Sequence, residues 1–185
     1  MRRKFKFWML LSVFSLAFLL PAPADAQTVG VTTNALGWAG LSPNIGVEVG
    51  FAGNWSVSLD GLVNPFTYAN GRKSNLWAVQ PELRYWPRHK FAGHVFGIHG
   101  QYGQYDWSMR KMGYRGDFKG VGVSYGYAYM LHKRWNVEGT IGFGYNRMDF
   151  VNRYDPFDPQ SCYGPSFYNY WGITRIGIKF TYFIK

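Results

Sequence analysis

The stretch "WNVEGTIGFGY", residues 135–145, alternates between two kinds of side chain. Its odd positions carry Trp, Val, Gly, Ile, Phe and Tyr, whereas its even positions carry Asn, Glu, Thr and Gly. Because successive side chains of a β-strand point to opposite faces, this period of two predicts a strand with one apolar and one small, polar face. Aromatic residues end the apolar face at Trp135 and Tyr145. Such a face is typical of strands that cross a bilayer, where Trp and Tyr rings lie at headgroup level.

The same alternation recurs along most of the chain, and no stretch after residue 26 shows a helical period. It predicts eight strands of about ten residues, which is the length of a transmembrane β-strand. The predicted strands are 28–38, 44–52, 55–64, 76–86, 93–105, 118–131, 135–146 and 170–183. Eight strands suffice to close a small up-and-down antiparallel barrel, and closure removes the exposed edges. The predicted fold class is therefore an all-β, eight-stranded transmembrane barrel.

Short and long connections alternate between these strands. The short ones are 52–54, 87–92 and 132–134, and the long ones are 65–75, 106–117 and 147–169. The connection 39–43 is the exception, because it is short although it lies at the same end of the barrel as the long ones. Short periplasmic turns and longer extracellular loops are typical of outer-membrane barrels. Three tryptophans beside the short turns, Trp55, Trp86 and Trp135, predict one aromatic girdle. The predicted outer girdle consists of Tyr68, Trp107, Tyr145, Tyr168 and Tyr170.

The polar faces carry few charges among Gly, Ser, Thr and Asn, which suits the narrow lumen of a small barrel. The inward charges are Glu48, Asp60, Glu82, Arg84, Glu138, Arg175 and Lys179. Charges in a narrow lumen must be paired, because burying each ion alone costs several kcal/mol. The sequence therefore predicts an interior network of salt bridges and hydrogen bonds that plugs the barrel. The alternative is that these residues are solvated surface charges.

The N-terminus predicts export. Arg2, Arg3, Lys4 and Lys6 precede an apolar run from Phe7 to Leu20, and Ala24-Asp25-Ala26 is a small-x-small cleavage site. This is the pattern of a cleavable Sec signal peptide over residues 1–26, which leaves one barrel domain over residues 27–185 and predicts an outer-membrane location. The alternative, a membrane-anchor helix, requires a longer apolar run. The net charge of +10 comes from scattered rather than clustered residues, so no nucleic-acid partner is expected. The expected partner is the lipid of the outer membrane.

Several stretches resemble a known family. They are "TNALGWAGLSPNIGVEVGFAGNWSVSLDG" (33–61), "QPELRYW" (80–86), "GHVFGIHGQYGQY" (93–105), "KRWNVEGTIGFGY" (133–145) and "GITRIGIKFTYFIK" (172–185). Over nearly the whole chain after residue 26, the sequence is similar to domain-of-unknown-function family 3575, a family of small Gram-negative outer-membrane proteins. The resemblance implies an eight-stranded outer-membrane barrel without an established activity. Since some members are encoded beside fimbria-like surface proteins, it also implies a role in surface assembly with such a partner.

The chain departs from this resemblance at two places. Members of the family often carry two cysteines in the last long loop, whereas Cys162 is the only cysteine here. The chain also ends in Phe183, Ile184 and Lys185 rather than in a terminal Phe. The last loop is rich in aromatic residues and is the predicted contact surface for a partner. Its candidate contact residues are Tyr154, Phe157, Cys162, Tyr163, Phe167 and Tyr168.

No catalytic, cofactor or metal site is expected. Some small outer-membrane barrels modify lipids with a His–Ser pair near a rim. Of the four histidines, His99 has the parity of a lumen residue, but no spacing pairs it with Ser56, Ser58 or Ser124. Asp155 and Asp158 match no known Ca²⁺-binding loop. The alternatives to a structural or anchoring protein are an outer-leaflet lipid-modifying enzyme and a soluble periplasmic ligand-binding barrel; the oligomeric state stays open.

Overall fold

The computed structural model describes residues 28–51, 53–67, 73–109, 112–155, 158–163 and 166–184; the side chains of 67, 73, 109, 112, 150–155 and 158–163 are outside that description. The predicted signal peptide and Tyr68 also lie outside it. The elements are β1 (Thr28–Asn34), α2 (Ala35–Ala39), β2 (Asn44–Phe51), β3 (Trp55–Thr67), β4 (Lys73–Tyr85), β5 (Gly93–Met109), β6 (Met112–His132), β7 (Trp135–Asp155), β8 (Asp158–Tyr163) and β9 (Ser166–Phe183).

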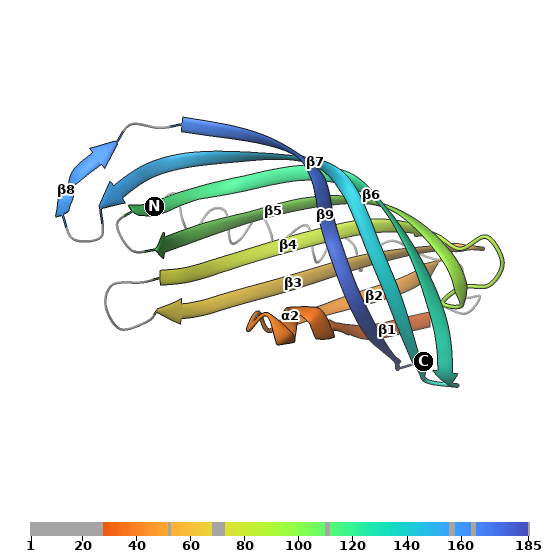
Figure 1. Cartoon of the computed structure of the whole chain (residues 1–185). Helices are drawn as coiled ribbons and strands as arrows, with labels where there is room; N and C mark the ends of the chain where they lie inside the picture. The colour runs from red at the N-terminus through yellow and green to blue at the C-terminus, as the bar shows by residue number, and fades with distance from the viewer. Residues whose placement is uncertain are drawn as a thin grey trace, which may run out of the picture.

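Eight of these strands form a closed, antiparallel, up-and-down barrel, as the alternation predicted. Each strand from β1 to β7 pairs with the next along the chain, and β9 closes the barrel by pairing with both β7 and β1. The closing register places Gly30 opposite Phe183 and Asn34 opposite Lys179. Among the described strands, the short β8 pairs with β7 alone, and the two form a hairpin that extends beyond the barrel wall (Figure 1).

The strands on the long-connection side are longer than predicted. Segments 65–75, 106–117 and 147–169 were expected as loops, but β3 continues to Thr67, β5 to Met109 and β7 to Asp155. Backbone pairing continues there although polar and charged residues interrupt the apolar alternation, because the ladder hydrogen bonds do not depend on which medium the side chains face. The barrel thus carries protruding β-hairpins on this side, which is the left side in Figure 1.

The first predicted strand, 28–38, was wrong in its second half. Strand β1 ends at Asn34, and the helix α2 follows directly. The Asn34 side chain accepts a hydrogen bond from the Leu36 backbone N–H (3.1 Å), which is the usual role of Asn at a helix N-cap. The same Oδ1 accepts from the Ile178 backbone N–H (3.1 Å), so the cap also ties α2 to β9.

The outer surface of the barrel is apolar. Residues on the outward faces of the central strands include Ile98, Val123 and Phe143, and the Ile98 side chain is 66% exposed. Trp55 and Trp135 lie on this outer surface beside the short turns, where each ring contacts a tyrosine. The predicted position of Trp86 in that girdle was wrong. Trp86 has the same parity as Arg84 on the preceding strand, so it points inward and is fully buried.

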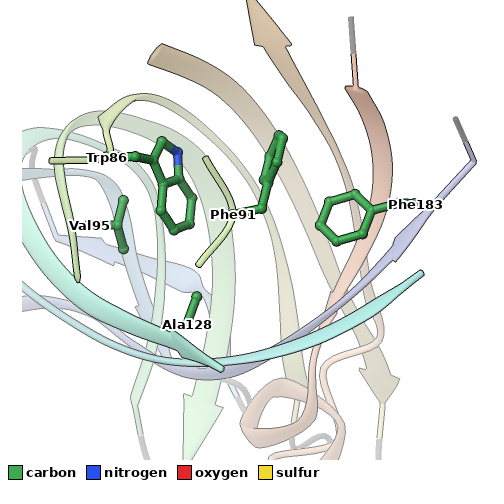
Figure 2. Close-up of a cluster of buried hydrophobic side chains, with 5 residues drawn as sticks. All are labelled: Trp86, Phe91, Val95, Ala128 and Phe183. Carbon is green, nitrogen blue, oxygen red and sulfur yellow. The ribbon is translucent and has the colours of Figure 1, made fainter. Parts of the chain in front are cut away.

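Trp86 belongs to a buried apolar cluster that fills the lumen at the short-turn end (Figure 2). Its ring centroid lies 5.6 Å from that of Phe91, which lies 4.8 Å from that of Phe183. Phe91 has a left-handed backbone (φ 64°), an uncommon conformation for a bulky residue. This turn folds the Phe91 ring back into the barrel, where Val95 and Ala128 complete the cluster.

A β-bulge in β9 reverses the alternation of its first half. Gly142 of β7 pairs with Arg175, and the next residue, Phe143, pairs with Ile173, so Thr174 is the extra residue. The inward positions therefore change from odd at Arg175 to even at Tyr170 and Tyr168, which line the lumen. The prediction that these tyrosines belong to the outer girdle was wrong for this reason. Trp107 also lines the lumen, because it pairs with the inward Ser74.

Candidate functional site

The centre of the lumen holds a buried ionic cluster around Arg84. Its Nη1 lies 2.5 Å from Glu48 Oε2, its Nη2 donates to Glu138, and its Nε lies 3.4 Å from Glu82 Oε2. The side chains of all four residues are at most 2% exposed. Strands β2, β4 and β7 supply these groups, so a single guanidinium joins three strands across the lumen. The Arg84 guanidinium also lies 5.0 Å from the Trp86 ring centroid, a cation–π contact with the apolar cluster below.

A second group of ions continues the cluster toward the long hairpins. Arg175 bonds Asp60 (Nη2 to Oδ2, 2.6 Å) and pairs with Glu82 (Nη1 to Oε2, 3.2 Å). Lys179 Nζ lies 3.4 Å from Asp60 Oδ2 and 3.5 Å from Glu48 Oε2. Because Glu48 and Glu82 contact cations in both groups, the seven predicted residues lie together in one connected network.

Polar residues that the sequence analysis did not include complete the network. Ser56 donates to Glu48 (2.7 Å), Ser124 donates to Glu82, and Thr32 donates to Asp60 (3.0 Å). The Trp86 indole N–H donates to Ser56 Oγ (2.8 Å). Their inward parity was the available signal, since Ser56 and Ser124 share it with the neighbouring acids. These bonds matter because a carboxylate buried in a protein needs several partners to offset its lost hydration.

A row of side-chain amides lies directly above the ions. Arg175 donates to Gln80 Oε1 (3.1 Å), Gln80 Nε2 donates to Gln101 Oε1 (3.0 Å), and Gln101 Nε2 donates to Asn146 Oδ1. The last bond passes over Gly120 of β6. A Cβ at Gly120 would lie 2.5 Å from the Tyr145 carbonyl oxygen and would also collide with Asn146, so glycine is required for this bond.

His99 is buried in the lumen, as its parity predicted, but its partner is not a serine. Its Nε2 lies 2.9 Å from Thr174 Oγ1 on the bulge of β9. The ring packs over Gly122 and Gly142, where a Cβ would come within 2.9 Å of imidazole atoms. Nδ1 is buried and has no hydrogen-bond partner within the described part of the chain. A nucleophile–base–acid triad would place a carboxylate on that nitrogen, and none of the described residues does so.

The long-hairpin half of the lumen contains a cavity of about 1090 Å³. The inward positions of β4 show where it ends: Leu76, Ala78 and Gln80 line it, whereas Glu82, Arg84 and Trp86 do not. Asp60, Arg175 and the amide row form its floor, and Tyr105, Phe118 and Tyr170 belong to its wall. Trp107 and Tyr168 line its mouth, where each side chain is about half exposed. We call this cavity the cup.

Of the candidate contact residues in the last loop, two can be placed. Tyr168 is at the mouth of the cup, and Phe167 is exposed under the Arg147 guanidinium, with 5.0 Å between the guanidinium carbon and the ring centroid. Backbone pairing sets Tyr154 opposite Cys162 and Arg153 opposite Tyr163. The side chains of Tyr154, Cys162 and Tyr163, and all of Phe157, lie outside the described residues.

The outer face of the paired strands β6 and β7 carries a small ion group near the long hairpins. Arg147 Nε donates to Asp149 Oδ1 (2.8 Å), and Lys119 Nζ lies 3.5 Å from Asp149 Oδ2. The hydrogen bond from Arg147, together with the two positive charges, holds the pKa of Asp149 below its ordinary value.

The described residues contain no cluster of three or more His, Cys, Asp or Glu side chains that could hold a metal ion. None of their helices has the length and apolarity needed to cross a membrane.

The fold and its interior define a small, closed, eight-stranded β-barrel with an ionic core and an apolar exterior. More particularly, the chain belongs to the DUF3575 family, described as proteins of unknown function, whose family model matches residues 9–184. The comparisons with curated proteins and with solved structures gave no match.

Proposed function

We propose that this protein is a non-catalytic outer-membrane barrel that anchors or helps to assemble surface components. The proposal rests on the distribution of the protein's side chains, which is the reverse of that in a water-soluble protein: polar inside and apolar outside. Ions at most 2% exposed occupy the centre of the barrel, while Ile98, Val123 and Phe143 stand on its outer surface at half exposure or more. Such an exterior is expensive in water but stable in lipid, and apolar-out, polar-in alternation is the rule for membrane barrels.

The proposed barrel is a closed anchor rather than a pore. From the short-turn end, the lumen is filled in turn by the apolar cluster, the ionic network and the amide row. A water column would have to pass the Arg84 guanidinium, whose three nitrogens all face carboxylates. Opening that path would break several charge-assisted contacts at once, so steady conductance is not expected.

The proposed location and partner follow from the same arrangement. The predicted signal peptide over residues 1–26 would deliver the chain to the periplasm, and a barrel of this size would insert with its short turns on the periplasmic side. The protruding hairpins would then face outward and present exposed aromatic residues such as Phe167 and Tyr168 to a surface or fimbria-like protein. Cys162 offers a single thiol in this region for crosslinking.

The first test is cell fractionation followed by gel migration of unheated and heated samples. The protein is expected in the outer-membrane fraction and should migrate faster unheated, because a folded barrel resists detergent. A periplasmic, heat-insensitive protein would reject the membrane proposal and favour the soluble barrel. Planar-bilayer recordings form the second test, and steady conductance of the purified protein would reject the closed lumen.

A partner is tested separately by crosslinking through Cys162 on intact cells. A specific heterologous product identified by mass spectrometry supports the assembly role and names the partner; the Cys162→Ser variant controls for the thiol. Efficient labelling of Cys162 without a crosslinked protein argues against a contact at this loop.

A lipid-modifying activity is the second candidate, and only one observation favours it. His99 Nε2 and Thr174 Oγ1 lie 2.9 Å apart, and Thr174 lines the cup. An enzyme of this kind should leave altered lipids in a deletion strain, and Thr174→Val should reproduce that change without loss of folded barrel.

A further inference from the structure

The cup has no role in the anchoring function proposed above, yet it is large and chemically specific. Its volume of about 1090 Å³ slightly exceeds the range of ordinary small-molecule sites, roughly 300–1,000 Å³. It combines two kinds of lining: aromatic side chains around the wall and mouth, and uncharged amides across the floor. Side chains that filled this space would add buried contacts to the barrel, so the open cavity and its polar floor are better explained by a ligand than by stability.

The amide row leaves donors directed toward no protein acceptor that the described contacts include. A carboxamide has two N–H donors, and Gln80 and Gln101 each use one of them along the row. Asn146 ends the row as an acceptor, so its own amide nitrogen is not used in the row. The amide nitrogens of Gln80, Gln101 and Asn146 therefore each carry at least one N–H that the row itself does not use.

Charges at the floor favour a neutral ligand over an anionic one. Arg175 and Lys179 are each paired with carboxylates and are almost fully buried, with side chains 9% and 3% exposed. The most accessible charged group is the Asp60 carboxylate, which is 22% exposed. Its Oδ1 accepts one bond, from Thr32, and keeps a lone pair that could accept from a ligand hydroxyl. A ligand carboxylate or phosphate would meet this charge before it reached the cations.

The walls supply flat apolar surfaces beside these polar groups. The Tyr105 and Phe118 rings lie 6.5 Å apart with an interplanar angle of 36°, and Tyr170 lines the same space from β9. Pyranose rings have C–H faces that pack on aromatic rings and edges of hydroxyl groups that pair with amides and carboxylates. Trp107 and Tyr168 continue the aromatic lining to the mouth.

We propose that the cup binds a neutral saccharide of two or three sugar rings, with its hydroxyl groups on Gln80, Gln101, Asn146 and Asp60 and its ring faces on Tyr105, Phe118 and Tyr170. The inference concerns the lumen alone and is independent of where the barrel resides or what its loops contact. It assigns the protruding hairpins a second task, because they raise the aromatic mouth of the cup above the barrel wall.

The test is binding of neutral trisaccharides to the full mature chain refolded in dimethylamine-oxide detergent, which has no sugar headgroup. Galactose, glucose, mannose and N-acetylglucosamine trimers are titrated by calorimetry, with saturation-transfer NMR to identify the bound protons. At least one trimer should bind saturably. Trigalacturonate is the charged match for the galactose trimer and should bind at least about tenfold more weakly than the best neutral trimer.

Two variants locate the site, and one matched variant controls for it. Gln101→Leu and Tyr170→Leu should each weaken binding about tenfold, as expected when a buried hydrogen bond or a stacking surface is lost. Tyr145→Leu removes a tyrosine from the outer face of the adjacent strand and should leave binding unchanged. Unheated gel migration establishes that each variant is folded. Absence of saturable binding for every neutral trimer, tighter binding of trigalacturonate, or equal affinity in all folded variants would each overturn the proposal.

Discussion

Replacement of Arg84 by Met should destabilise the barrel more than any other single loss of charge. The substitution keeps an unbranched, flexible side chain but removes the guanidinium, which leaves three carboxylates without their shared cation. Glu48 keeps Lys179 at 3.5 Å and Glu82 keeps Arg175 at 3.2 Å, whereas Glu138 has no other cationic partner among the described residues. Removing one partner of a buried ion pair costs about 3–5 kcal/mol, and the uncompensated Glu138 places this case at the upper end.

Urea unfolding in phospholipid vesicles measures this cost, with tryptophan fluorescence and unheated gel migration as two probes of the same transition. Adding Glu138→Gln to Arg84→Met should restore at least about 1 kcal/mol, because it removes the charge that was left unpaired. The pair Arg115–Asp106 provides the control, because its guanidinium is 56% exposed at the surface: Arg115→Met should cost less than Arg84→Met, by about 2 kcal/mol or more. If Arg84→Met costs no more than Arg115→Met, the cluster does not stabilise the barrel and the reasoning fails.

Three further predictions concern other layers of the molecule. Trp86→Ala should lower the free energy of unfolding by about 3–5 kcal/mol, because a fully buried indole leaves a cavity; an unchanged urea midpoint would mean that the apolar cluster repacks freely. Ile98→Arg should destabilise the membrane-inserted barrel by about 2–4 kcal/mol if this outward side chain faces lipid, and equal stability of variant and parent in vesicles would contradict a lipid-facing position. Arg147→Gln should raise the pKa of Asp149 toward its ordinary value, which carboxyl NMR titration measures. The pKa of Asp149 is depressed in the folded protein, so this ion group stabilises at neutral pH and its contribution disappears as the pH falls through that pKa; a pKa that the substitution does not move would exclude Arg147 as the cause.

The alternation of apolar and polar residues was sufficient to predict most of the fold. The period of two in stretches such as 135–145 placed eight strands in the correct order, and the inward faces it defined hold Arg84 and its acidic partners. This works because a barrel has only two environments, and each residue's parity assigns it to one of them. The ionic residues were also easy to recognise, because charged side chains stand out on faces that otherwise carry small and uncharged polar residues.

The assignment of inward and outward side chains from odd and even residue numbers was wrong where the backbone departs from a regular strand. The bulge at Thr174 shifts the count by one, so Tyr168 and Tyr170 were assigned to the wrong face and the aromatic cup was missed. A bulge inserts one residue without changing the composition of the strand, so only the register reveals it. Trp86 was assigned to a girdle from its type and position beside a turn, although its parity with Arg84 already indicated the lumen. The strand extensions beyond the predicted ends of β3, β5 and β7 were missed because their composition is that of loops.

The distribution of charge over the strands has a consequence for the kinetics of assembly. Strands β2, β3, β4 and β7 contribute four acids, but only Arg84 among the network's cations precedes β9. Arg175 and Lys179 both arrive on β9, the strand that closes the barrel against β1. An open intermediate thus carries mutually repelling carboxylates along its inner face, and closure and neutralisation occur in the same step. Pairing between strands so distant in sequence is intrinsically slow, so the rate-limiting step should be the docking of β9. The rate of this step should depend on ionic strength, because the charges are still exposed to solvent. The unfolding rate of the closed barrel should depend on it much less, because the same charges are then buried and paired.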